Sequence, residues 1–121
     1  MRSWSATNFA RTIVQKLEIY QSLWAMELRS PHVPERGDAE AFAMIAEAGF
    51  DGVCLDPSVK EIPANLDRRD LFVEYDLGCM VHAFPHGPGD MQPLLDFALT
   101  MKACIVNVIS GILPIRPEDA V

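Results

Sequence analysis

Three short segments of the chain repeat one pattern at a nearly constant spacing. Each begins with a small residue, continues with three apolar residues and ends in a polar one: GVCLD (52–56), GCMVH (78–82) and ACIVN (103–107). The polar residues that end them, Asp56, His82 and Asn107, are 26 and then 25 residues apart, close to the length of one strand–helix unit. Short apolar runs bounded by Gly, Pro and Asp predict buried strands that are covered on both faces.

The stretches between these segments have the pattern of amphipathic helices. The strongest is DAEAFAMIAEA (38–48), whose apolar residues gather on one face. We expect Asp38 to be its N-cap, and Gly49 to follow it in the left-handed conformation, with Phe50 making the apolar contact of a Schellman motif. Two more helices are predicted, at 67–76 (capped by Asn65, closed by Gly78) and at 91–102 (capped by Asp90).

The order of these elements defines the fold class. A first strand is predicted at IYQSLWAM (19–26) and a last one at CIVNVIS (104–110). Strands and helices therefore alternate, which predicts an α/β fold with four parallel strands in one sheet and right-handed crossovers. We expect residues 1–16 to be an N-terminal extension and residues 17–121 to be one domain.

The amino-acid composition and net charge indicate which kinds of partner the protein can bind. Half of the 121 residues are hydrophobic and 22% are charged, which is typical of a globular domain. The formal net charge is −7, and the longest basic cluster is Arg68–Arg69, so we expect no nucleic-acid partner. No apolar stretch approaches the length of a membrane span, so we expect no membrane partner either.

Three cysteines, Cys54, Cys79 and Cys104, each lie in an apolar run. Their odd number and the lack of C-x-x-C spacing argue against both a disulfide framework and a zinc site. We therefore predict reduced and mostly buried thiols, and a cytoplasmic location.

The polar residues that end the repeated segments are the first candidates for a site. Ligands of parallel α/β folds bind at the carboxyl ends of the strands, so Asp56, His82 and Asn107 are predicted to line one pocket. The alternative is that each of them only satisfies a nearby loop amide or caps the next segment.

Three further residues belong to the predicted substrate site. Trp24 and Glu27, at the end of the first strand, are candidates for an apolar wall and a polar contact, and His86 lies on the loop after the third strand. Core packing is the alternative for Trp24, and simple solvation is the alternative for His86. Arg29 and His32, in the loop that follows the first predicted strand, are candidates for contact with an anionic substrate. The chain contains no G-x-G-x-x-G, P-loop or G-x-S-x-G motif, which argues against a dinucleotide site and a serine hydrolase.

The segments SLWAME, AFAMIAEAGFDGVCLD, DLGCMVHAFP and ACIVNVISG together resemble the N-terminal half of xylose isomerase-like TIM barrels, over residues 19–121. This superfamily contains sugar isomerases, sugar-phosphate isomerases and epimerases, and endonuclease-IV-like enzymes. The resemblance implies a partial (β/α)₈ barrel, a half barrel, that binds a sugar or sugar phosphate. It also implies a divalent metal, Mn²⁺, Mg²⁺, Co²⁺ or Zn²⁺, for the whole enzyme.

In the isomerases and epimerases of this superfamily the metal ligands are Glu, Asp, His and Glu on strands five to eight, so the resemblance assigns no metal ligand to this chain. It implies a fragment of a metal-dependent isomerase or epimerase that moves protons next to a carbonyl and is inactive by itself. The alternative is a non-catalytic half barrel that forms a homodimer through its open edges or binds a small ligand. A nuclease of the endonuclease-IV branch is disfavoured by the acidic charge. The segment PIRPEDAV (114–121) is predicted to begin a helix, so we expect an incomplete barrel.

Overall fold

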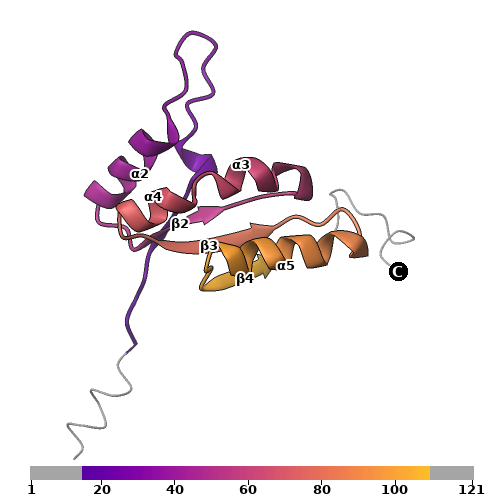
Figure 1. The fold of residues 1–121 in the computed structure, drawn as a ribbon. Helices are drawn as coiled ribbons and strands as arrows, with labels where there is room; N and C mark the ends of the chain where they lie inside the picture. Colours follow the sequence, from indigo (N-terminus) through magenta and orange to yellow (C-terminus); the bar gives the residue numbers. More distant parts are fainter. Residues whose placement is uncertain (1–14, 110–121) are drawn as a thin grey trace, which may run out of the picture.

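A computed structural model of the chain describes residues 15–109, which form one parallel sheet with helices between its strands (Figure 1). The strands stand in the sheet in their order along the chain, and each neighbouring pair is parallel. They are β1 (Tyr20–Ser22), β2 (Gly52–Leu55), β3 (Gly78–Ala83) and β4 (Ile105–Val108). The predicted α/β class with four parallel strands in one sheet is confirmed. The predicted helix start at 114–121 and most of the predicted extension 1–16 lie outside the described residues.

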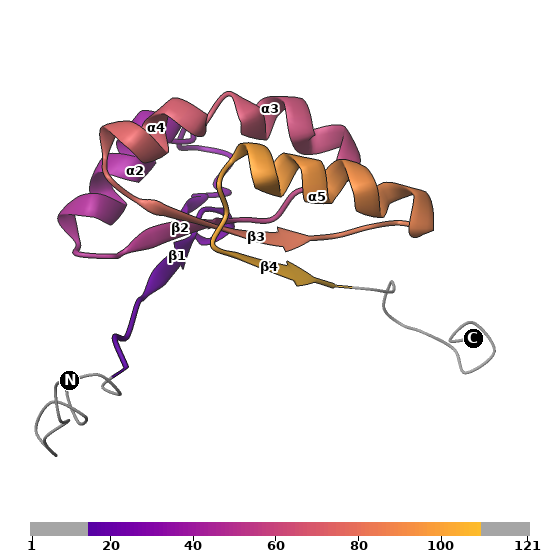
Figure 2. The same cartoon turned by 60° about the horizontal axis from the view of Figure 1, so that its bottom comes forward.

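The helices all lie along one face of this sheet (Figure 2). They are α2 (Asp38–Glu47), α3 (Ile62–Leu66), α4 (Arg69–Glu74) and α5 (Met91–Thr100), with short 3₁₀ turns η1 (Trp24–Met26), η2 (Val59–Glu61) and η3 (Pro88–Asp90). Within residues 15–109, no helix has the length and apolar character needed to cross a membrane.

The hydrophobic core lies between the sheet and these helices. Side chains of a strand alternate between its two faces, so Cys79, Val81 and Ala83 of β3 point toward the helices and are buried. Phe42 of α2 and Phe72 of α4 close the core with an edge-to-face contact, their ring centroids 5.0 Å apart and their planes at 87°.

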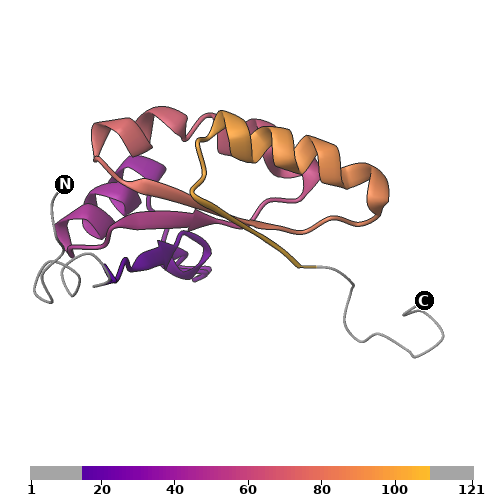
Figure 3. The ribbon, with the colours of Figure 1, turned by 90° about the horizontal axis from the view of Figure 1, so that it is seen from below.

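The opposite face of the sheet, called the open face below, carries no helix in the described part of the chain. This differs from the prediction of strands covered on both faces. The sheet curves so that its edge strands β1 and β4 lie on the side away from the helices (Figure 3). The side chain of Tyr20 in β1 lies across this curved face. Its ring lies over Gly52 and Gly78, and its hydroxyl is 3.1 Å from Cys104 Sγ, next to β4. The Tyr20 side chain thus connects one edge strand, β1, to the residue that precedes the other edge strand, β4.

The predicted end of the first long helix is confirmed. Gly49 has φ +92°, its amide donates to Ala46, and the Phe50 amide donates to the Ile45 carbonyl, which is the Schellman pattern. The helix predicted at 67–76 is α4 in the structure, and it is closed by the same hydrogen-bond pattern with Asp76 in the left-handed conformation at φ 52°. The prediction had placed this closing residue at Gly78. Gly78 instead opens β3, where the Tyr20 ring needs the space of a missing side chain.

The predicted helix caps were less accurate. Gly37 precedes α2 as its N-cap, and the carboxylate of Asp38 instead pairs with Arg68 at 2.9 Å. Asn65 does not cap a helix at 67–76, because it lies inside α3. Asp90 does stand at the start of α5, but its carboxylate accepts the backbone amide of His86 at 2.8 Å. The partner of Asp38 lies 30 residues away in the sequence, whereas Asn65 and Asp90 form hydrogen bonds with backbone groups four residues away.

The first predicted strand was too long. Pairing with β2 stops at Ser22, and residues 24–26 form the turn η1. Trp24 therefore lies in a turn beyond β1, and Glu27 follows that turn.

A capping box between β2 and α3 was missed. The Ser58 side chain accepts a hydrogen bond from the backbone amide of Glu61. The Glu61 carboxylate accepts one from the backbone amide of Ser58, at 3.2 Å. The sequence Ser58-Val-Lys-Glu61 has the S-x-x-E spacing of this motif, so the signal was present.

We expect Ser58→Ala to lower the free energy of unfolding by about 1 kcal/mol at pH 7, because the box loses its hydroxyl. Hydrogen bonds from Ser58 hold the pKa of Glu61 below its usual value. A carboxyl group with a lower pKa in the folded state stabilises the fold above its unfolded-state pKa, about 4.3, and loses that contribution as the pH falls through the folded-state value. The difference between wild type and variant in urea unfolding should therefore shrink below about pH 4. A difference that grows on acidification would contradict this assignment.

Candidate functional site

A hollow of about 130 Å³ lies at the carboxyl ends of β1 and β2. Three predicted site residues line it: Trp24, Glu27 and Asp56. Its other lining residues are Leu23, Leu55, Glu61, Asn65 and Arg68. We call it the β1–β2 hollow; it lies at the end of the strands where the sequence predicted a pocket.

Arg68 brings a fixed positive charge to the β1–β2 hollow. Its Nη1 donates to Asn65 Oδ1 at 2.7 Å, while Nε and Nη2 donate to the Asp38 carboxylate at 2.9 and 3.3 Å. Asn65 is buried, and its own amide donates to the Glu61 carbonyl at 2.9 Å. Two helices, α2 through Asp38 and α3 through Asn65, thus hold one guanidinium group, and Asp38 offsets part of its charge.

Trp24 and Glu27 are organised by Arg29. The Arg29 guanidinium carbon lies 3.6 Å from the centroid of the Trp24 ring, and its Nε donates to Glu27 Oε2 at 3.1 Å. Glu35 closes the same loop by accepting the backbone amides of Leu28 and Arg29, and these hydrogen bonds lower the pKa of Glu35. Arg29, a candidate for an anionic substrate, is therefore engaged with Trp24 and Glu27.

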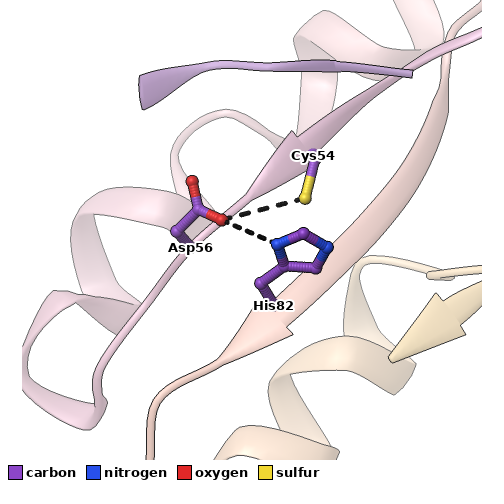
Figure 4. A group of neighbouring side chains, drawn as sticks. All are labelled: Cys54, Asp56 and His82. Carbon is purple, nitrogen blue, oxygen red and sulfur yellow. Dashed lines mark hydrogen bonds and ion pairs between the residues drawn. The ribbon is translucent and has the colours of Figure 1, made fainter. Parts of the chain in front are cut away.

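Asp56 also takes part in a second group of side chains, with Cys54 and His82 (Figure 4). Asp56 Oδ1 lies 3.2 Å from His82 Nδ1 and 3.8 Å from Cys54 Sγ. Its other oxygen accepts the Ser22 hydroxyl at 3.3 Å. Burial and then the neighbouring Asp56 charge raise the pKa of Cys54 to about 12, so its thiol stays protonated at neutral pH. We call these three residues the Cys–Asp–His cluster.

Asn107 and His86 are less closely joined to the site. Asn107 pairs with His82 in the β3–β4 register, so both lie on the open face, but Asn107 is exposed and does not line the β1–β2 hollow. His86 is exposed on its loop and also lies outside the lining of the hollow. The six predicted residues therefore divide around Asp56: Trp24 and Glu27 on one side, His82 and Asn107 on the other, and His86 apart.

Sequence reasoning missed three residues of the hollow: Glu61, Asn65 and Arg68. All three lie on the helical segment that follows β2. The capping box at Ser58–Glu61 would have predicted a helix start there, directly after the strand end at Asp56.

The three thiols are free, as predicted, but Cys104 is exposed, contrary to the prediction. It precedes the edge strand β4, which has no further strand beside it in residues 15–109. Burial raises the pKa of Cys54 and of Cys79 to about 12, with the neighbouring Asp56 charge adding to the effect at Cys54.

We expect iodoacetamide at pH 7.5 to label Cys104 well before the other two cysteines, because only thiolates react and only Cys104 is exposed. Peptide mapping by mass spectrometry measures the order of labelling. Equal rates for all three sites in native protein, with equal rates in urea as the reference, would contradict the described burial.

The Cys–Asp–His cluster has the donor atoms of a metal site. Among residues 15–109, one group of three potential ligand side chains has its donor atoms within 4.8 Å of one another, and it is the Cys–Asp–His cluster. A sulfur, a nitrogen and an oxygen suit Zn²⁺ or Co²⁺, whereas Mg²⁺ requires oxygen ligands. This donor set therefore favours Zn²⁺ or Co²⁺ over Mg²⁺ and Mn²⁺.

Comparison with family models, curated proteins and solved structures gives no significant match.

Proposed function

We propose that this chain forms the substrate-binding half of a xylose isomerase-like barrel, and that its β1–β2 hollow binds a sugar or sugar phosphate. The observation that carries the proposal is the composition of the hollow. It combines the indole of Trp24 with the carboxylates of Glu27 and Asp56 and the guanidinium of Arg68.

These groups suit a polyhydroxylated ligand. Carboxylates accept hydrogen bonds from sugar hydroxyls, a guanidinium donates to hydroxyl, carbonyl or phosphate oxygens, and an indole packs against C–H groups. The volume, about 130 Å³, is smaller than the roughly 300–1,000 Å³ of drug-sized sites, so a small ligand or one end of it is favoured.

The arrangement of the sheet supports a barrel more than a doubly wound fold. Strands in sequential order with helices along one face are wound in one direction, whereas doubly wound folds reverse direction and carry helices on both faces. In a barrel the open face would become the interior. In the isomerases and epimerases of the family the metal ligands lie on strands five to eight, so we expect this chain to show negligible isomerase turnover by itself.

A panel of aldoses, ketoses and their phosphates, added to ¹⁵N-labelled metal-free protein, tests the proposal by NMR. We expect shifts concentrated at the Trp24 indole and the Arg68 side chain, with a Kd on the order of 1 mM, since a half site offers part of the contacts. Trp24→Ala and Glu27→Gln should each weaken binding about tenfold, whereas Glu47→Gln, an exposed carboxylate at the far end of α2, should not.

The alternative is a half barrel that serves as a dimerising or structural module. Size-exclusion chromatography with light scattering separates it from the proposal. A stable homodimer that binds none of these sugars would overturn the proposed function.

A further inference from the structure

We infer that the Cys–Asp–His cluster is a binding site for a zinc ion, with Cys54 Sγ, Asp56 Oδ1 and His82 Nδ1 as its protein ligands. The site lies on the open face, where β2 and β3 run side by side (Figure 4). It is separate from the metal centre that the family resemblance implies, which belongs to strands five to eight.

Two of the three distances between ligand atoms are close to those around a bound zinc ion. Bonds of about 2.0–2.1 Å to N and O and about 2.3 Å to S, at tetrahedral angles, place neighbouring ligand atoms roughly 3.3–3.6 Å apart. Asp56 Oδ1 lies 3.2 Å from His82 Nδ1 and 3.8 Å from Cys54 Sγ. The third pair of atoms, Cys54 Sγ and His82 Nδ1, lies within 4.8 Å, so a zinc ion can bind all three once the side chains close around it.

The backbone fixes this arrangement. Cys54 and Met80 are paired across β2 and β3, so His82 in β3 and Asp56, directly after β2, each lie two residues further along the chain, on the same face. Cysteine spacing predicted no zinc site because this one takes its ligands from two strands, with a single cysteine. The signal that was available is the repeat itself, which places Asp56 and His82 at equivalent strand ends.

The surroundings also suit a metal. Ser22 donates to Asp56 Oδ2 and leaves Oδ1 for the ion, which is the usual role of a residue that orients a metal ligand. The side chains of Asp56 and His82 are 23% and 32% exposed, so an ion can enter from the open face. Three protein ligands leave a fourth position for water or for a substrate oxygen, as in catalytic zinc sites.

Zinc binding releases one proton from the protein. The Cys54 thiol loses its proton to solvent and bonds to zinc as a thiolate. Neutral His82 carries its proton on Nε2 and bonds through Nδ1, and Asp56 bonds as a carboxylate. No electron is transferred.

The full chain, stripped with chelator and titrated with Co²⁺, tests the site without any sugar, so the outcome does not depend on the proposed function. We expect one equivalent of Co²⁺ to give the visible bands of a tetrahedral complex together with a thiolate charge-transfer band, and Zn²⁺ to displace it. Cys54→Ser should remove the charge-transfer band, and Cys54→Ser and His82→Gln should each lower zinc affinity about 100-fold or more. Ser22→Ala should lower it about tenfold.

Cys104→Ser is the matched control, because it removes a cysteine near the same face but outside the cluster, and it should bind zinc as wild type does. Histidine-ring NMR of the wild-type protein avoids any question of misfolded variants: Zn²⁺ should shift the nitrogens of His82 and leave those of His32 and His86 in place. Absence of the cobalt spectrum, loss of binding in Cys104→Ser, or shifts confined to His32 and His86 would each overturn the inference.

Discussion

Gly52→Ala is expected to destabilise the fold by about 3 kcal/mol, near the upper end of the range for overpacked sites. A Cβ atom at this position would overlap Tyr20 Cε2 and the backbone carbonyl oxygen of Gly78. Tyr20 can move only by giving up its contact with Cys104, and the Gly78 carbonyl belongs to the neighbouring strand. Urea unfolding measures the loss as a lower midpoint at unchanged slope.

Gly78→Ala is the comparison that makes the result specific. There the added Cβ would meet only Tyr20 atoms, the hydroxyl oxygen at 2.5 Å and Cζ at 3.3 Å. Tyr20→Phe should therefore rescue much of the loss in Gly78→Ala but little of the loss in Gly52→Ala, whose backbone clash remains. Equal rescue of both variants would show that the Tyr20 ring does not lie across the two glycines as described.

These two glycines also show what the sequence could predict. The alternation of strands and helices follows from apolar periodicity and from Gly49, because these signals act within one segment of chain. The repeat placed Gly52 and Gly78 at equivalent strand starts, but it gave no reason for a small residue there. That reason is the ring of Tyr20, which comes from more than thirty residues earlier in the chain than Gly52.

The candidate site also contains both residues that the sequence predicted and residues that it did not. Asp56 and His82 were predicted to lie close together because the carboxyl ends of parallel strands meet at one edge of the sheet, and they are in contact at 3.2 Å. Arg68 was not predicted, because its position depends on Asp38 and Asn65, which the fold brings together from two other helices. The repeat at the strand ends thus anticipated the contact between Asp56 and His82, but not the ion pair that helix packing forms between Arg68 and Asp38.

Phe42→Ala is expected to have the largest effect on stability, a loss of about 4 kcal/mol. The Phe42 side chain is fully buried and forms the edge-to-face contact with Phe72 that joins α2 to α4. Natural domains are stable by only about 5–15 kcal/mol, so this variant should melt roughly 15 °C or more below wild type in a thermal scan. Met44→Ala on the same helix is the control; Met44 is 43% exposed, and its loss should change stability by about 0.5 kcal/mol or less.

The same substitution tests how the core supports the candidate site. Helix α2 carries Asp38, which holds two nitrogens of the Arg68 guanidinium. If packing by Phe42 fixes α2 on the sheet, Phe42→Ala at a temperature where it is still folded should broaden or shift the Arg68 side-chain resonances, and Met44→Ala should not. Unchanged Arg68 resonances in a folded but strongly destabilised Phe42→Ala would mean that Asn65 alone positions the guanidinium, and that the β1–β2 hollow is independent of the core behind it.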